Sequence, residues 1–182
     1  MGPNGSGKTT LLHLIVGLLR PEEGEVEVFG KRRVEEEDFK EVRQRIGLLF
    51  QDPDDQLFSP TVAEDVAFGS LNLGKGREEA RRIVKRTLEA LGLEGLGERF
   101  THTLSGGEKR LVSLATVLAM EPEVLLLDEP TAGLDEETTE RIIEILTSSP
   151  LTYVIVTHDR ELLRRTTTTL YRLNSGRLHR IR

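Results

Sequence analysis

The sequence predicts one domain of the α/β class, and three observations point to it. Apolar runs of strand length at Val124–Asp128 (VLLLD) and Thr152–His158 (TYVIVTH) are each followed by a helical pattern. The chain opens with a glycine-rich stretch, Met1–Thr10 (MGPNGSGKTT), that leads into a helix. Between residues 61 and 120 the pattern is helical. A length of 182 residues suits one sizeable core with a small subdomain.

The first part of the chain alternates helix and strand patterns. Residues Thr9–Arg20 (TTLLHLIVGLLR) predict a helix that is apolar nearly all round, and therefore buried, with Pro21 closing it. A short alternating strand at Gly24–Gly30 (GEVEVFG) and a more buried strand at Ile46–Phe50 (IGLLF) follow. The charge-dense residues 31–45 between them predict a solvated loop and helix face.

The later elements continue this alternation after the helical region. The clearest amphipathic helix is Arg77–Leu93 (REEARRIVKRTLEALGL), which is followed by a glycine-rich exit ending at Gly97. The chain closes with two short strand-like pieces around the turn Asn174-Ser175-Gly176.

Composition excludes several classes of function. The 25 basic and 31 acidic side chains give a formal net charge of −6, which argues against a nucleic-acid partner. The absence of cysteine excludes disulfides, thiolate metal sites and thiol catalysis, and it fits a reducing, cytoplasmic setting. No apolar run approaches the roughly 20 residues that span a bilayer, so a membrane role would require a partner.

The opening stretch carries a phosphate-binding pattern. From Gly2, GPNGSGKT fits G-x-x-x-x-G-K-[ST] at every fixed position, although a plain glycine-rich turn is the alternative interpretation. The glycines let backbone N–H groups turn toward phosphate oxygens, and the helix presents its positive end. Lys8 would reach the β and γ phosphates of ATP, and the Thr9 hydroxyl would be a ligand of Mg²⁺. The ATP-binding residues predicted here are Asn4, Gly5, Ser6, Gly7, Lys8, Thr9 and Thr10.

Two acids follow the strand in VLLLDEP. A buried parallel strand delivers them at its C-terminal edge, where ligands bind in open α/β sheets. Asp128 is predicted to hold Mg²⁺ directly or through water, and Glu129 to polarise the attacking water as the catalytic base. The alternative is a pair of acids that only solvate a strand end.

The motif LSGGEKR predicts a capped helix start. Ser105 and Glu108 fit the capping-box pattern S-x-x-E. With Gly106 and Gly107, such a start also offers free backbone N–H groups and a positive dipole end, which together make a second anion site. Because one nucleotide's phosphates already rest on the glycine loop, a second site suggests that another copy of the chain completes the pocket.

These motifs, together with Gln51, AGLD at residues 132–135 and His158 in VTHD, stand in the order found in ATP-binding cassette (ABC) ATPases. The chain resembles that family over nearly its whole length. The resemblance implies an α/β P-loop NTPase fold with an inserted helical subdomain. The implied parts of this single domain are a nucleotide-binding core at residues 1–51 and 121–182 and a helical subdomain at residues 52–120.

The resemblance further implies a head-to-tail dimer. Two ATP molecules would each lie between the phosphate loop of one protomer and the LSGGE helix start of the other. Gln51 would approach Mg²⁺ and the attacking water, and Asp135 would bridge the protomers. His158 would contact the γ-phosphate, unless it makes only a local hydrogen bond at a strand end.

Residues 50–69 (FQDPDDQLFSPTVAEDVAFG) look like the ATPases of energy-coupling factor and cobalt or nickel importers. In such proteins the segment of Gln56 helps to couple the ATPase to a membrane subunit, and its Pro-Asp-Asp composition predicts exposure. A solvated turn is the alternative. Glu108 stands where other ABC signatures have glutamine, and this family tolerates glutamate at that position.

The implied function is hydrolysis of ATP, with Mg²⁺ as cofactor, to power import of a metal ion (cobalt or nickel) or a vitamin. The implied partners are a second ATPase chain, identical or paralogous, a membrane coupling subunit and a substrate-binding membrane subunit. The chain would then be peripheral, at the cytoplasmic face of the membrane. Two alternatives are a soluble ABC ATPase of DNA repair or translation and an ATP-binding protein with little turnover. The first is disfavoured because the sequence has neither long heptad repeats nor a second cassette.

The start of the chain carries a further expectation. A phosphate loop normally follows a buried strand, yet Gly2 begins the loop directly. The resemblance implies upstream strands and an aromatic residue that stacks on adenine. We therefore expect the sequence to be N-terminally truncated, with Met1 at an internal position of a longer protein and with low turnover as one consequence. We also expect unpaired backbone and an apolar groove in the sheet.

Overall fold

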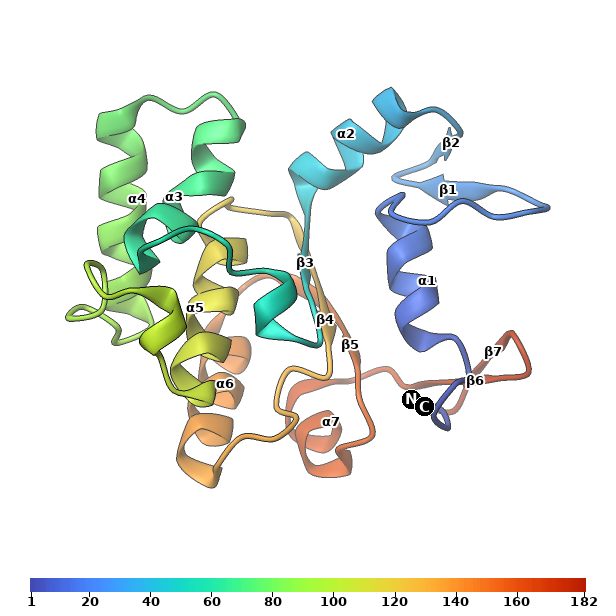
Figure 1. Cartoon of the computed structure of the whole chain (residues 1–182). Helices are drawn as coiled ribbons and strands as arrows, with labels where there is room; N and C mark the ends of the chain where they lie inside the picture. Colours follow the sequence, from blue (N-terminus) through green and yellow to red (C-terminus); the bar gives the residue numbers. More distant parts are fainter.

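The computed structural model describes residues 1–182. Its centre is a parallel sheet of three strands in the order β3-β4-β5 (Figure 1). The strands are β1 (Val26–Val28), β2 (Lys31–Arg33), β3 (Ile46–Leu49), β4 (Val124–Asp128), β5 (Thr152–Val156), β6 (Tyr171–Asn174) and β7 (Arg177–Arg180). The α-helices are α1 (Lys8–Ile15), α2 (Glu36–Arg45), α3 (Val62–Asn72), α4 (Arg77–Ala90), α5 (Gly106–Leu118), α6 (Glu136–Ser148) and α7 (Arg160–Thr166). Two single 3₁₀ turns are η1 (Pro53–Asp55) and η2 (Thr101–Thr103).

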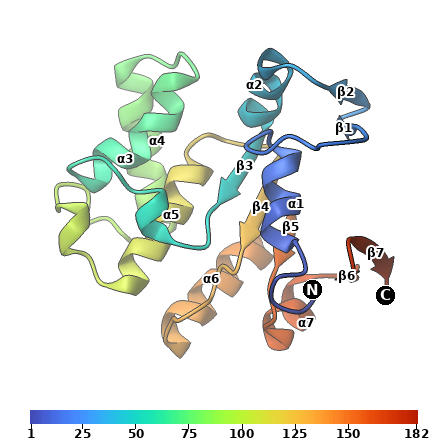
Figure 2. The same ribbon diagram turned by 45° about the vertical axis from the view of Figure 1, so that its right-hand side comes forward.

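Helices cover both faces of the central sheet. Along β4 the side chains alternate, as strand geometry requires: Leu125 and Leu127 join the large hydrophobic cluster, and Leu126 joins the small one. The small cluster includes Leu12 of α1 and Phe39 of α2. Figure 2 shows α1 on one side of the sheet and α5 and α6 on the other. The predicted α/β class is confirmed.

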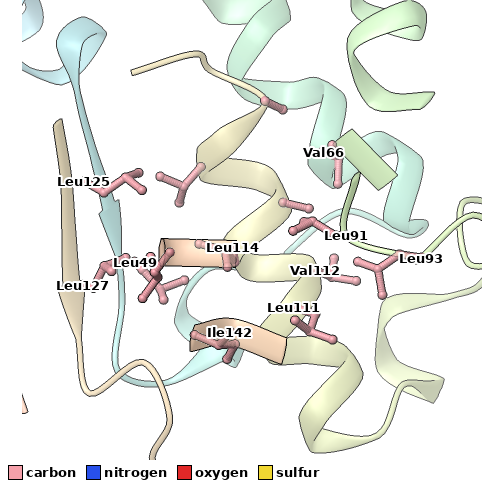
Figure 3. Packing of buried hydrophobic residues seen from close by; sticks show 14 of the residues in the cluster. Leu49, Val66, Leu91, Leu93, Leu111, Val112, Leu114, Leu125, Leu127 and Ile142 are labelled. Carbon is pink, nitrogen blue, oxygen red and sulfur yellow. The ribbon is translucent and has the colours of Figure 1, made fainter. Parts of the chain in front are cut away.

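The large cluster runs from the sheet through α5 into α3 and α4. Leu114 lies between the sheet and α5, while Val66 and Leu91 lie on the far side of that helix (Figure 3). Every residue of α5 from Arg110 to Ala115 is buried, because the helix packs on the sheet and on the helical region at once. None of the helices combines the length and the apolar character that crossing a membrane requires.

The helix after the glycine loop is shorter than the sequence predicts. α1 stops at Ile15, whereas the apolar pattern extends to Arg20. Gly17 has φ +74°. Its N–H donates to the Leu14 carbonyl, and the Leu18 N–H donates to the His13 carbonyl, so the helix ends in a Schellman motif. The prediction that this whole apolar segment is buried is therefore wrong, and Leu18 is 49% exposed.

The charge-dense stretch also holds more structure than predicted. Its first residues form β2, which pairs with β1 across the turn Phe29-Gly30, both residues having positive φ. Its later residues form α2, whose Phe39 and Val42 are fully buried, although the charge density of the stretch predicts a solvated face. Arg33 is buried as well, and its ion pair with the exposed Glu41 holds the pKa of that carboxyl at about 2.

An apolar groove lies along one edge of the central sheet. Strand β5 pairs with β4 along one edge only. An apolar groove of about 560 Å³ lies between this strand and β6, lined by Leu12, Tyr153 and Leu173 among others. Met1 lies at its border, where its carbonyl accepts from the Leu173 N–H and its amino group donates to the Tyr171 carbonyl. The closing hairpin β6-β7 forms as predicted, with Ser175 and Gly176 at positive φ.

Candidate functional site

The glycine loop leads directly into a helix start that is free to bind an anion. Gly5 and Gly7 have φ +74° and +91°, a conformation that other residues rarely adopt. Gly7 is the N-cap of α1 and supplies no side-chain partner, so the first N–H groups of the helix remain available.

Lys8 lies across the loop that precedes it. Its ammonium donates to the Gly2 and Pro3 carbonyls, each at 3.0 Å. The Ser6 hydroxyl is buried without a hydrogen-bond partner. A phosphate bound in the loop would give Lys8 an anion, which is the arrangement that the sequence predicts.

Thr9 and Asp128 meet at the end of β4. The Thr9 hydroxyl donates to Asp128 Oδ2 at 2.5 Å, while the buried Oδ1 has no partner. A hydroxyl and a carboxylate with a free oxygen are hard ligands of the kind that Mg²⁺ binds when substrate oxygens and water complete its shell. The structure contains no group of three or more His, Cys, Asp or Glu side chains that could hold a metal ion.

Glu129 lies beside this pair in a strained backbone conformation. Its φ is +45°, which is rare for a residue with a side chain and typical of functional sites. Its Oε2 accepts from the Thr157 hydroxyl at 2.8 Å, and its Oε1 lies 2.9 Å from His158 Nδ1. Because a carboxylate has no proton to give, Nδ1 is the donor, and the largely exposed ring leaves Nε2 free.

One cavity of about 440 Å³ unites these groups. It contains most of the residues that the sequence predicts for phosphate, metal and catalysis, and it adds Ala132. Ser6 is absent from the lining. The lining residues from the prediction are Asn4, Gly5, Gly7, Lys8, Thr9, Thr10, Gln51, Asp128, Glu129 and His158.

Three of the LSGGE residues, Ser105, Gly107 and Glu108, line a different cavity of about 300 Å³ together with Asp135. The predicted residue Gly106 is absent from this lining. The predicted capping box is confirmed: the Ser105 N–H donates to the Glu108 carboxylate at 2.7 Å, and the Glu108 N–H donates to Ser105 Oγ at 3.2 Å. The Ser105 N–H lowers the pKa of Glu108. Within one chain, the two predicted halves of an ATP pocket are therefore separate.

Asp135 and Gln56 both make local contacts that their sequence motifs do not predict. Asp135 is the N-cap of α6, accepting from the Thr138 N–H at 2.7 Å. Gln56 is half-buried: it donates to the Ser113 carbonyl at 2.8 Å and accepts from the Phe50 N–H at 3.1 Å. The exposure predicted for that loop is confirmed at Asp52, Asp54 and Asp55, but it is wrong at Gln56.

The sequence pattern does not indicate two residues that contact Glu129, namely Thr157 and Arg110. Thr157 stands in the strand motif TYVIVTH, where nothing in the pattern indicates that its hydroxyl holds Glu129. Arg110 stands in LSGGEKR and is 2% exposed, although arginine on a capped helix normally indicates a solvated position. The partners of both side chains are distant in the sequence, so only the structure reveals these contacts.

Comparison with known proteins places this geometry in a family. The family model described as ABC transporter matches residues 1–132, which is more than half of the chain. The chain belongs to the ABC transporter family. A putative ABC transporter ATP-binding protein of Nitratidesulfovibrio vulgaris is 53% identical over 176 residues, covering 97% of this chain and 64% of the relative. An energy-coupling factor transporter ATP-binding protein, EcfA, of Methanothermobacter thermautotrophicus is 47% identical and covers 98% of this chain.

The chain spans less than two thirds of these relatives' length, 64% and 58% respectively. Solved structures agree with the fold of this ABC family member. The cbiO1 protein of Clostridium perfringens, part of the transporter complex cbiONQ, superposes with a TM-score of 0.86 at 38% identity, covering 98% of this chain and 73% of that one. The ATP-binding cassette MJ0796, solved as a dimer bound to ADP and Pi, superposes with a TM-score of 0.87 at 31% identity, covering 100% and 84%.

Proposed function

We propose that this chain hydrolyses ATP and thereby powers a membrane importer whose cargo is a metal ion, cobalt or nickel, or a vitamin. The observation that carries the proposal is the contact of Glu129 with Thr157 and His158, beside the Thr9–Asp128 pair and in one cavity with the glycine loop. The names of the relatives, among them an energy-coupling factor ATPase and a cbiO1 protein, support the choice of importer.

The glycine loop would bind the triphosphate. The N–H groups at the start of α1 and the Lys8 ammonium would face the phosphate oxygens. Thr9 and Asp128, with Gln51 approaching from the end of β3, would hold Mg²⁺. Bound Mg²⁺ would neutralise charge on the β and γ phosphates.

Glu129 would act as the general base. One of its oxygens would accept a proton from the attacking water while the water oxygen bonds to the γ-phosphorus and the bond from that phosphorus to the β–γ bridging oxygen breaks. Each oxygen has a second lone pair beyond its present contact, so both contacts can persist during proton transfer. His158 would hold the carboxylate and present its exposed edge to the γ-phosphate.

A second copy of the chain would complete the site. The cavity with Ser105, Gly107 and Glu108 is separate from the phosphate cavity, and it is walled by the free N-terminal end of α5. In a head-to-tail dimer this end would meet the nucleotide bound by the partner's loop, with Asp135 at the border between protomers. The dimeric MJ0796 structure supports such an assembly.

A membrane subunit would dock beside η1. Phe58 is 66% exposed and Phe68 45%, and their rings meet edge to face with centroids 4.7 Å apart. They border an apolar groove of about 230 Å³ that also contains Gln56 and Met120. Exposed aromatic side chains around a groove suit a protein partner, which would keep this subunit peripheral, at the cytoplasmic face of the membrane.

The test is release of Pi from ATP by the chain, with and without Mg²⁺. We expect Mg²⁺-dependent release that Lys8→Ala abolishes and that Glu22→Gln, a change of an exposed acid far from the cavity, leaves unchanged. ATP binding without release would instead identify an ATP-binding protein with little turnover.

A further inference from the structure

Arg110 is a buried cation without a carboxylate partner. It lies one turn into α5 and is 2% exposed. Its guanidinium donates only to backbone carbonyls: Nε to Pro130 at 2.9 Å, Nη1 to Phe50 at 2.5 Å, and Nη2 to Asp128 at 3.1 Å and to Glu129. Burial lowers the pKa of Arg110, although the nearby Asp128 carboxylate opposes the shift. A buried charge is costly, so its retention here requires an explanation beyond packing.

The four carbonyls belong to the two loops that carry the reacting groups. Phe50 immediately precedes Gln51, and the residues from Asp128 to Pro130 surround Glu129. The planar fork of one arginine therefore fixes the backbone of both loops against the helix that begins at Gly106.

Glu129 depends on such a support. Its positive φ costs of order 1–3 kcal/mol and persists only where the surroundings hold it. Its N–H bonds to the Val156 carbonyl at 2.8 Å, and its carbonyl is held by Arg110. Without the Arg110 guanidinium, the Glu129 carbonyl would lose its hydrogen-bond donor. The backbone that orients the Glu129 carboxylate would then be held only by the bond from the Glu129 N–H.

We propose that Arg110 is a positioning residue for the hydrolysis: it locks the backbone of Glu129 and Gln51 to the α5 helix, whose N-terminus would contact the partner's nucleotide. This inference rests on the ATPase function proposed above. Arg110 itself is not among the residues that line the phosphate cavity. Its effect is therefore on the placement of the base, and a displacement of about 1 Å can cost a reaction about 10²-fold.

The test compares Arg110→Lys with Arg86→Lys, a matched change on the exposed face of α4. Lysine keeps the charge but cannot span four carbonyls. We expect Arg110→Lys to lower kcat by about 10²-fold with KM within twofold, and Arg86→Lys to change neither. In a Glu129→Gln background, Arg110→Lys should cause no further loss, because its effect passes through the base.

Hydrolysis by Arg110→Lys within threefold of wild type would overturn the proposal. So would a parallel fall of kcat and ATP affinity, or losses that multiply with Glu129→Gln, since either result indicates a general structural role. If Arg110→Lys does not fold by circular dichroism, Arg110→Gln, which buries no charge, takes its place with the same criteria. An absence of hydrolysis by the wild-type chain would reject the ATPase function itself, and the role of Arg110 with it.

Discussion

Replacing Glu129 by glutamine changes one atom of the site and leaves its shape. The glutamine oxygen can still accept from the Thr157 hydroxyl, which lies 2.8 Å from Oε2. The amide NH₂ then faces His158 Nδ1, where the carboxylate oxygen lay at 2.9 Å. Since two donors cannot pair, we expect the imidazole to shift its proton to Nε2, so that Nδ1 accepts from the amide.

This geometry predicts a large effect on kcat and a small effect on stability. The amide cannot take a proton from water, so kcat should fall by about 10²–10⁴-fold. Stability should change little, because two effects oppose each other. Loss of a charge-assisted hydrogen bond costs about 1.5–3 kcal/mol, whereas glutamine removes the cost of burying a charge at a residue that is 8% exposed. Affinity for ATP should stay within about threefold, because Lys8 and Thr9 are untouched.

The assay measures single-turnover Pi release together with ATP binding and thermal unfolding. The matched control is Glu22→Gln, which changes an exposed acid outside the cavity. The ¹⁵N resonances of the His158 ring report the expected change of tautomer. Turnover by Glu129→Gln within threefold of wild type would refute the assignment of Glu129 as the base, whatever the effect on stability.

Three further outcomes are expected. Mg²⁺ and ATP should dimerise the Glu129→Gln chain in light scattering, and adding Ser105→Arg should prevent this by filling the anion site at the α5 start; an ATP-dependent dimer that survives this addition would contradict the shared pocket. Reversing the charges of the exposed Asp54-Asp55 pair should spare Pi release in solution but weaken reconstituted transport, and transport at full rate would remove that loop from the docking surface. The hydrogen bond that lowers the Glu108 pKa stabilises the folded helix start above the ordinary carboxyl pKa and is lost as pH falls through the lowered value. The protection of the Ser105 amide, which is its exchange rate relative to the intrinsic rate at the same pH, should therefore fall only in acid; a loss of protection near neutral pH would exclude this cause.

The strands and the site motifs could be predicted because their signals are local. VLLLD is apolar enough to be a buried strand in any α/β sheet, and its last residue, Asp128, is fixed at the sheet edge by that assignment. The same holds for the capping box, in which Ser105 and Glu108 are three residues apart and require no distant partner. These signals place the cavity before any coordinates are known.

The predictions that were wrong concern features that depend on tertiary context or on a single backbone angle. The early end of α1 results from the left-handed conformation of Gly17, which competes with an apolar pattern that runs on to Arg20. Burial of Phe39 among charges requires the small core under α1, which the charge density of the stretch conceals. The inward turn of Gln56 depends on the Ser113 carbonyl, which is 57 residues away in the chain.

One experiment tests directly whether two chains share each ATP. Lys8→Ala damages the phosphate loop, and Ser105→Arg damages the helix start, so each variant alone should release almost no Pi. In a head-to-tail dimer of one chain of each kind, the intact loop of the Ser105→Arg chain meets the intact helix start of the Lys8→Ala chain. We expect that mixing the two inactive variants restores Pi release well above the sum of their separate rates. Release no greater than that sum, with both variants folded, would contradict the shared site.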